Sequence, residues 1–381
     1  MGITFTPDAI QRIAYAAYNG VYNRRKPIII DRKRMPWLSF LSKHEDTAPL
    51  SGAQGVIIKQ KIYGGLDVQG WERRDPLNFA EQDFELETQF PWANLHEGAL
   101  FVHDDIEAMG FTVLPNQPRG KNFAKADSES DAYKLVDWVS EAIEDMMDTF
   151  DVKFDQLMQA DNSANPKLPQ GLDAYWPIGS TPGMVTDGDG TRGYYSSGSV
   201  GGKTRSAFPD LQHFVWYNAT YGANGSLRKA LTVARREAEL RSRGRTKGGI
   251  TFIKAGAAFI DKYVAFAQAN GIQYHLMPAG TPKLDIGIPD TGLHFEGVPI
   301  IHDPTHEIRD TIEGTLTVPW TRRAYLVDVD SVCVAYAPGK KRYFSAPMDE
   351  GDMREVRLSL DSKLVLLPKV TNANAVVAVA A

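Results

Sequence analysis

One segment of the sequence carries a helical pattern long enough to constrain the whole fold. Between residues 130 and 160, apolar side chains recur every three or four positions: Val136, Val139, Ile143, Met146, Phe150, Phe154 and Leu157. This spacing predicts a single amphipathic helix, which would be about 45 Å long. Its other positions are mostly acidic: Asp131, Asp137, Glu141, Glu144, Asp145, Asp148, Asp151 and Asp155. We therefore expect a rigid rod that supports other parts of the fold.

Two strand patterns before this helix predict an extended hairpin. Residues 83–90 alternate between apolar and acidic or polar side chains, and residues 56–63 form a second strand-like run. Lys59 and Lys61 share one face of the earlier strand, where they would pair across the hairpin with Glu85 and Glu87. The connection contains Trp71, Arg73 and Arg74. It is much longer than the usual hairpin loop, so we expect the hairpin to project from the body.

The beginning of the chain combines a short helix with a basic arm. Thr6 and Pro7 are typical of a helix start, and the pattern predicts a helix up to about residues 19–20. Basic side chains follow at Arg24, Arg25, Lys26, Arg32, Lys33 and Arg34. Their charge is opposite to that of the long helix. We therefore expect the arm to lie along Glu141, Glu144 and Asp148, in the same subunit or in a neighbour; the alternative is that both segments are simply solvated.

The second half of the chain has an α/β pattern. Residues 179–204 are rich in glycine and are expected to form a mobile loop. Helices are predicted over 226–243 and 257–269. Strands are predicted over 250–253, 272–276, 284–288, 293–301, 324–329, 331–337 and 354–367.

Composition limits the class of protein. The 381 residues are 43% hydrophobic and 23% charged, which is enough to bury a large core. The net charge of −5 is not that of a protein that grips nucleic acid along its length. The single cysteine, Cys333, excludes an intrachain disulfide and lies in an apolar strand, where we expect a buried thiol. No apolar run approaches the ~20 residues of a membrane span.

The sequence can be compared with four kinds of catalytic or cofactor site: a dinucleotide site, a phosphate loop, a nucleophile elbow and a metal site. Gly188–Gly193 matches a dinucleotide-binding spacing but lacks a preceding strand and a following helix. The segment 198–204 resembles a phosphate loop with one residue too few. No nucleophile elbow occurs. A metal site is conceivable at His294, Glu296, His302, Asp303 and His306, although prolines interrupt this cluster. We expect no catalytic, cofactor or metal site; the alternative is a metal-dependent α/β enzyme that uses the His294–His306 cluster.

The order of these elements resembles that of the major capsid proteins of tailed bacteriophages or prophages, which have the Hong Kong 97-type fold. Gln170-Gly171-Leu172-Asp173 is similar to the turn that opens the central domain in such proteins. The segment Leu293–Pro304, with Gly297-Val298-Pro299-Ile300-Ile301, is similar to a strand late in that domain. Arg354–Pro368 and the apolar run after Asn372 look like the closing strand that returns to the long helix.

The resemblance implies an α+β subunit with five parts. These are an N-terminal arm (1–49), an extended hairpin loop (50–100), a peripheral domain with a spine helix (101–169), an α/β axial domain (170–345) and a closing strand of the peripheral domain (346–381). The expected contacts between subunits involve the basic arm, Lys59, Lys61, Trp71, Arg73, Arg74 and the acidic residues Glu141, Glu144 and Asp148.

The resemblance also implies a function. The chain would be a non-enzymatic shell subunit that needs no cofactor. It would assemble in the host bacterial cytoplasm as pentamers and hexamers and form the virion capsid around double-stranded DNA. Its partners would be copies of itself, with a separate scaffolding protein, a portal and decoration proteins as further candidates. DNA would be contacted only weakly, and membranes not at all. No motif identifies a covalent cross-linking pair. An encapsulin-like shell is the alternative within the same fold.

Overall fold

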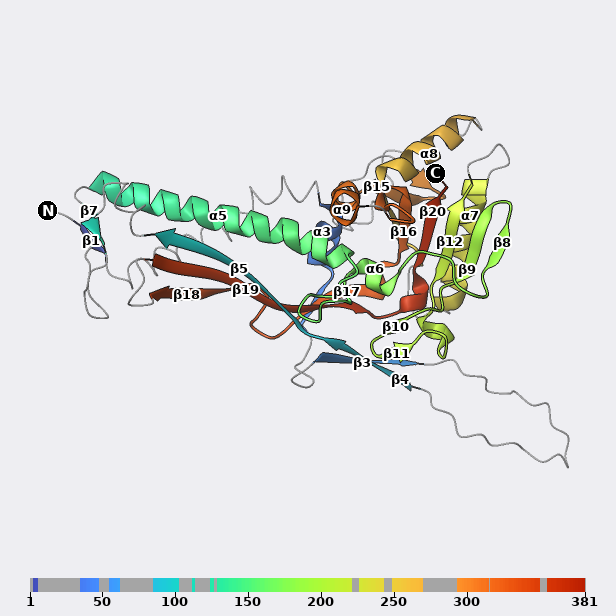
Figure 1. Ribbon diagram of the computed structural model, residues 1–381, viewed down its shortest axis with the longest axis horizontal. Helices are drawn as coiled ribbons and strands as arrows, with labels where there is room; N and C mark the ends of the chain where they lie inside the picture. Colours follow the sequence, from blue (N-terminus) through green and yellow to red (C-terminus); the bar gives the residue numbers. More distant parts are fainter. Residues whose placement is uncertain are drawn as a thin grey trace, which may run out of the picture.

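The structure is a computed structural model that describes residues 3–5, 35–47, 55–61, 85–102, 112–113, 124–126, 129–220, 226–242, 249–269, 293–314, 316–349 and 355–380. The molecule is elongated. A long helix and a narrow sheet form one end, and a wide sheet with flanking helices forms the other (Figure 1). Among the described residues there are two hydrophobic cores: one lies under the long helix and the narrow sheet and reaches one face of the wide sheet, and the other lies on the opposite face of the wide sheet.

The predicted long helix is present as α5 (Glu129–Gln159). Ile143, Met146, Phe150 and Phe154 from its apolar stripe are buried. The stripe covers a five-stranded sheet, in which β19 (Glu355–Pro368) pairs with β5 (Ala93–Val102), β17 (Val332–Tyr336) and β18 (Tyr343–Asp349), while β2 (Glu45–Thr47) joins β17 in parallel. This is the peripheral half of the fold.

The acidic faces of α5 differ from the expectation at two positions. Asp151 and Asp155, one turn apart, are 6% and 1% exposed rather than solvated. Asp151 pairs with Arg342, and Asp155 belongs to a buried polar network described below. A carboxylate can be buried only where such partners satisfy it, so the helix is less uniformly amphipathic than its spacing indicates.

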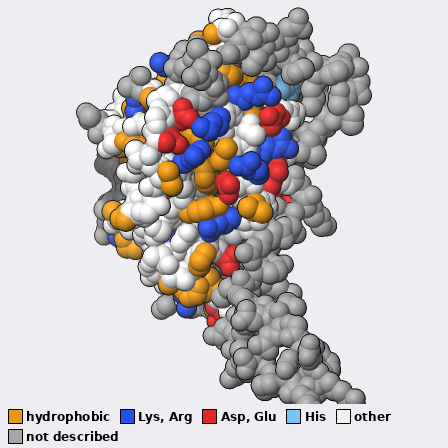
Figure 2. All heavy atoms as spheres, turned by 90° about the vertical axis from the view of Figure 1, so that its right-hand side faces the viewer, with side chains coloured by type: hydrophobic (Ala, Val, Ile, Leu, Met, Phe, Trp, Pro, Cys, Tyr) orange, Lys and Arg blue, Asp and Glu red, His pale blue; other side chains and the backbone are white. Residues whose placement is uncertain are grey.

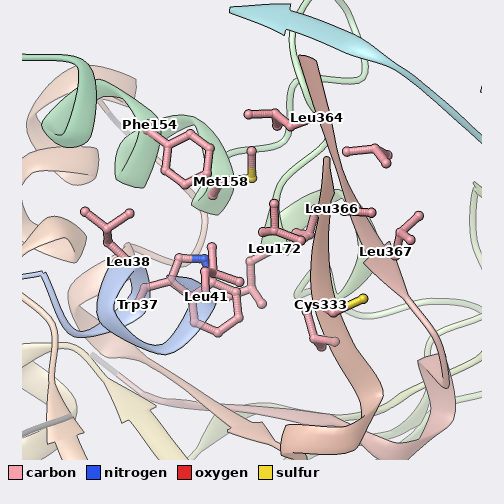
Figure 3. Packing of buried hydrophobic residues seen from close by; sticks show 14 of the residues in the cluster. Trp37, Leu38, Leu41, Phe154, Met158, Leu172, Cys333, Leu364, Leu366 and Leu367 are labelled. Atoms are coloured by element: carbon pink, nitrogen blue, oxygen red, sulfur yellow. The ribbon is translucent and has the colours of Figure 1, made fainter. Parts of the chain in front are cut away.

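A short helix, α3 (Pro36–Lys43), closes the core at the inner end of α5. Trp37, Leu38 and Leu41 of α3 face Phe154 and Met158 of α5, with Leu364 and Leu366 of β19 on the opposite side (Figure 3). Cys333 of β17 is buried in the same core, as the sequence predicts for an unreactive thiol.

The axial half is built on an eight-stranded sheet of order β14-β15-β13-β16-β20-β12-β9-β8. The strands are β14 (His294–Phe295), β15 (Val298–His302), β13 (Phe252–Ala255), β16 (Arg323–Val327), β20 (Ala375–Val379), β12 (Phe214–Ala219), β9 (Gly190–Tyr194) and β8 (Val185–Asp187). The predicted helices α7 (Ser226–Ser242) and α8 (Ala257–Ala269) pack their apolar faces into its core. A third helix, α9 (Thr305–Glu313), follows β15.

The base of the predicted hairpin is confirmed as β3 (Gly55–Lys61) paired with β4 (Glu85–Pro91). The register places Lys59 opposite Glu87 and Lys61 opposite Glu85, as expected. A small hairpin of β10 (Ser199–Val200) and β11 (Lys203–Thr204) supports it, since the Gln89 amide donates to the Gly201 carbonyl at 3.1 Å. Val56, Leu86 and Phe90 of the hairpin base are buried in the same core as the apolar stripe of α5, so the base is anchored to the body.

Short elements complete the described fold. They are the three-stranded sheet of β1 (Ile3–Phe5), β7 (Ala124–Ala126) and β6 (Thr112–Val113), the helix α6 (Leu172–Tyr175), and the single 3-10 turns Pro209–Leu211, Trp320–Arg322, Val329–Ser331 and Thr371–Ala373. The helix predicted up to residues 19–20 and the strands predicted over 272–276 and 284–288 lie outside the described residues.

The glycine-rich segment 179–204 differs from the expected loop because it contributes β8, β9, β10 and β11. β9 pairs with β12, and the glycines supply the left-handed backbone at the turns. A glycine-rich composition lowers strand propensity, but the neighbouring strand offers a complete set of hydrogen-bond partners.

The two halves are also less separate in sequence than the expected boundaries. β5 lies in the peripheral sheet although it begins inside the range 50–100. The range 346–381 divides between the sheets, because β19 is peripheral while β20 inserts between β12 and β16 of the axial sheet. Likewise β16 is axial and β17 is peripheral, so the chain passes between the halves repeatedly.

Gly171 provides a test of the joint between α5 and α6. A Cβ there would lie 2.5 Å from the Ala160 carbonyl oxygen and 2.6 Å from that of Leu157. We expect Gly171→Ala to lower the free energy of unfolding by about 1–3 kcal/mol, because backbone atoms would have to shift. Gly188→Ala is the matched control, since its Cβ meets open space. Urea denaturation of both variants checks this, and equal midpoints would contradict it.

Candidate functional site: a buried polar junction

A buried ion pair lies where the two halves of the fold meet. Lys254 of β13 and Asp303, the residue after β15, are 1% and 0% exposed. The Lys254 ammonium contacts the Asp303 carboxylate at 2.9 Å between Nζ and Oδ2, and it donates to Gln159 Oε1 of α5 at 2.6 Å. The pair therefore links two neighbouring axial strands to the end of the spine helix.

Asp155 brings a second carboxylate into the same cluster. Its Oδ1 accepts the Leu38 amide of α3 at 2.9 Å, and its Oδ2 accepts the Thr305 hydroxyl of α9 at 2.7 Å. The Gln159 amide nitrogen donates to Asp155 Oδ2 at 2.8 Å and to Asp303 Oδ2 at 3.1 Å. Gln159 thus uses both amide protons and its carbonyl to hold the two carboxylates and the ammonium together.

Local structure explains why these side chains converge. Asp155 and Gln159 are one turn apart at the end of α5, so they share a face. Lys254 sits inside β13, whose parallel partner β15 ends beside Asp303. Asp303 then begins α9 by accepting the Thr305 amide at Oδ1, at 2.9 Å. We name Asp155, Gln159, Lys254, Asp303 and Thr305 the junction network.

The pKa values of the ionisable groups in this network depend on their burial and on the charges of their neighbours. Burial lowers the pKa of Lys254, and the Asp303 and Asp155 carboxylates oppose that effect. Burial and the nearby Asp303 carboxylate raise the pKa of Asp155 to about 7, even though three donors favour its ionised form. Two carboxylates and one ammonium thus share a site without solvent.

A second buried cluster borders the first. Arg323 Nη1 contacts the Asp173 carboxylate at 2.9 Å, and the Tyr325 hydroxyl donates to it at 3.1 Å. His306 packs between the rings of Trp320 and Tyr325, and burial holds its pKa well below the ordinary value, so it is neutral. Lys254 lies 5.3 Å from the centre of the Trp37 ring. The junction is therefore buried and bordered by aromatic rings, while Arg323 of the second cluster also lines a pocket with Ile178, Tyr217 and Leu316.

The side chains of the histidine-rich segment His294–His306 take part in separate interactions. His302 lies 3.3 Å from Glu307, Glu296 accepts Arg235 at its carbonyl, and Asp303 pairs with Lys254. Over the described part of the chain, no group of three or more His, Cys, Asp or Glu side chains is arranged to hold a metal ion. In that same part, no helix combines the length and apolar content needed to cross a membrane.

The structure describes some of the contact residues predicted from sequence. Lys59 is exposed and pairs with Glu87 at 3.1 Å and Glu85 at 3.4 Å. Only the backbone register is described for Lys61. Glu141 and Asp148 are exposed and Glu144 is half-buried, and their spacing places them on one face of α5. Outside the described residues lie Arg24, Arg25, Lys26, Arg32, Lys33, Arg34, Trp71, Arg73 and Arg74.

Sequence reasoning missed most of the junction network. The spacing of Asp155 predicts a position on the acidic faces of the helix, and Gln159 and Thr305 belong to no motif. The available signal was Lys254, the one charged side chain in the apolar run Ile250–Ala255. A lysine there requires a buried partner, but its identity follows only from the fold.

Lys254 gives a prediction about the joint. We expect Lys254→Met to lower the free energy of unfolding by about 3–5 kcal/mol, because it leaves Asp303 buried without a counter-ion. The control is Lys229→Met, which removes an ion pair with Asp189 that is partly exposed to solvent. That change should lower the free energy of unfolding by less than about 1 kcal/mol. Chemical denaturation measures the stability of both variants. Similar decreases would show that the buried ion pair stabilises the protein no more than the exposed one.

Comparison with known proteins supports the architecture. No family model matches the chain, and no curated protein matches it. Among solved structures, the cyanophage A-1(L) capsid asymmetric unit is similar with a TM-score of 0.58 and 14% identity, over 91% of this chain and 92% of that chain. The capsid of a native GTA particle is similar with a TM-score of 0.51 and 11% identity, over 90% and 91% of the two chains.

Each of these similarities covers about nine-tenths of this chain. At this level of identity they define the arrangement of the chain and not its activity. They confirm the α+β architecture expected from the order of elements in the sequence. The chain has the Hong Kong 97-type fold of phage capsid subunits.

Proposed function

We propose that the chain is the structural subunit of an icosahedral phage capsid, which self-assembles into the shell that encloses packaged double-stranded DNA. The observation that carries this proposal is the match to two capsid structures over about nine-tenths of each chain. A likeness of that extent leaves little of the chain for an additional catalytic domain. In this proposal the protein is not an enzyme and needs no cofactor.

The shape of the subunit supports assembly through many contacts. The molecule is long, and the β3–β4 hairpin lies along one edge of it (Figure 1), with Val56, Leu86 and Phe90 of its base buried in the same core as the apolar stripe of α5. β3 and β4 form a two-stranded sheet of their own, and free strand edges favour pairing with another chain. A neighbouring copy that covers the hairpin would pair with or cover these edges. We therefore assign the range 50–100, apart from β5, to contacts between subunits.

The axial end presents a second candidate contact surface. Figure 2 shows basic and acidic side chains interspersed with apolar ones on this end of the molecule. The outer side of α7 carries the exposed residues Arg228, Lys229, Arg236, Glu239 and Leu240. Such a mosaic is typical of protein interfaces. In a closed shell, copies of this end would meet around the five-fold and six-fold axes, as pentamers and hexamers.

The predicted contact between the basic arm and the acidic side of α5 belongs to the same proposal. Glu141, Glu144 and Asp148 would form one side of that contact, and all three lie on one face of α5. Each exposed pair would contribute only about 0.2–1 kcal/mol, but a shell repeats the contact in every copy. The arm (1–49) would thus bind the peripheral domain of the same or a neighbouring subunit.

The remaining partners and the location follow from the proposed role. A separate scaffolding protein, a portal and decoration proteins would complete a virion assembled in the host bacterial cytoplasm. The net charge of −5 suits a wall that encloses dense DNA without gripping it. An encapsulin-like shell is the alternative of the same fold. It is distinguished by particle diameter and by a protein cargo in place of DNA.

The first test is sedimentation velocity of the purified chain, followed by electron microscopy of the fastest fraction. We expect closed particles of megadalton size, formed by the chain alone or with its scaffolding partner. A chain that stays monomeric under crowding, at high salt and with its scaffolding partner would contradict the proposal. Stoichiometric bound metal in that monomer would instead favour the enzyme alternative based on His294–His306.

Charge reversal tests the arm. We expect Arg24→Glu, Arg25→Glu and Lys26→Glu together to prevent or weaken assembly, because the arm would then repel the acidic side of α5. The matched control is Arg24→Lys, Arg25→Lys and Lys26→Arg, which keeps the charge. The yield of particles in a sucrose gradient, measured at low and high salt, provides the readout. Normal yields from the reversed variant would remove the arm from the contact.

A further inference from the structure

The junction network holds more negative charge than positive charge in a sealed place. Its ionisable groups are the Asp155 and Asp303 carboxylates and the Lys254 ammonium, and each side chain is at most 1% exposed. With all three ionised, the site carries one uncompensated negative charge. A buried net charge is costly because no water solvates it, and the uptake of one proton removes that cost.

Geometry decides which carboxylate takes the proton. Asp303 contacts the Lys254 ammonium directly at 2.9 Å, so this carboxylate already has a counter-ion. Asp155 is separated from that ammonium by Gln159, which bonds to both. Its Oδ2 faces the Thr305 hydroxyl at 2.7 Å, and a hydroxyl can accept as well as donate. After rotation of the Thr305 hydroxyl, its oxygen can accept a hydrogen bond from a proton on Asp155 Oδ2.

The other groups around Asp155 do not supply the missing positive charge. α3 contributes the Leu38 amide and the Trp37 ring. On α5, Asp151 is paired with Arg342. His306 of α9 is neutral, and Arg323 is occupied by Asp173. The charge balance of the junction thus depends on Asp155 itself.

We propose that the junction is a proton-controlled joint, in which a dissociable proton on Asp155 locks α3 and the spine helix to the axial sheet and its release loosens them. The elements that Asp155 connects belong to different halves of the fold: Leu38 lies in α3 of the peripheral core, while Thr305 begins the axial helix α9. Loss of the proton leaves a buried negative charge between these halves. The angle between spine and axial sheet is then less firmly held.

The direction of the pH dependence follows from the raised pKa of Asp155, which is about 7 against an ordinary 3.8. A group whose pKa is higher in the folded state stabilises that state at low pH, and the contribution is lost as the pH rises through the folded value. The joint is therefore locked in mildly acidic solution and loosened in mildly alkaline solution.

Hydrogen exchange of the Leu38 amide provides the test, because this amide donates directly to Asp155. Exchange is followed by mass spectrometry on the unassembled full-length chain at about pH 6 and about pH 8.5, after correction for the intrinsic rate. We expect the corrected rate to rise about tenfold with pH, as linkage requires for a group whose pKa changes by this amount on opening. A flat profile in the wild-type chain overturns the proposal.

Two variants identify the responsible group. Asp155→Asn is a permanently neutral replacement whose carbonyl can accept the Leu38 amide and whose amide nitrogen can donate to the Thr305 oxygen, although it loses the hydrogen bond from Gln159 Nε2. Its profile should be flat. Asp145→Asn, at an exposed position of the same helix, is the control and should keep the tenfold rise. A rise that persists in Asp155→Asn overturns the assignment to this residue. Should that variant fail to fold, the wild-type profile still decides. Since no shell is needed, failure of the proposed function would leave this result intact.

Discussion

The fold depends on one requirement: three buried ionisable side chains from distant parts of the sequence must meet in a single place. Lys254 alone in an apolar strand would be intolerable without Asp303, and Gln159 donates hydrogen bonds to both carboxylates, which still repel each other when both are ionised. The hydrogen bonds and the ion pair that these groups need fix the relative positions of four elements: the end of α5, the start of α9, α3 and β13. A hydrophobic core alone could adapt to small rotations; hydrogen bonds of this geometry cannot.

The path of the chain reinforces this joint. β16 and β17 are consecutive strands in different sheets, and so are β19 and β20. The peripheral and axial halves therefore share their connections and cannot separate as independent domains. Such interleaving resists relative movement of the two halves, and the junction network lies where they meet.

Much of the architecture could be predicted from local pattern. The limits of α5, α7 and α8 follow from helical periodicity, and the hairpin register follows from matching Lys59 and Lys61 with Glu87 and Glu85. These features depend on neighbouring residues or on a short-range charge match. The glycine-rich segment 179–204 was expected to be a loop because its composition opposes strand formation. It nevertheless supplies an edge of the axial sheet, because β12 offers a partner whose hydrogen bonds outweigh a weak intrinsic preference.

What the sequence by itself determined is the set of elements: a spine helix, a projecting hairpin, an α/β second half and the order in which they occur. Periodicity and charge pattern encode these locally, and the order resembled one capsid fold. Only the tertiary structure decided which polar residues are buried. Asp155 has the same spacing as the solvated acids of α5, and Gln159 and Thr305 have no pattern at all. Their role arises from contacts across about 100 or more residues of chain, and the pairing of buried charges is decided by which elements meet in space.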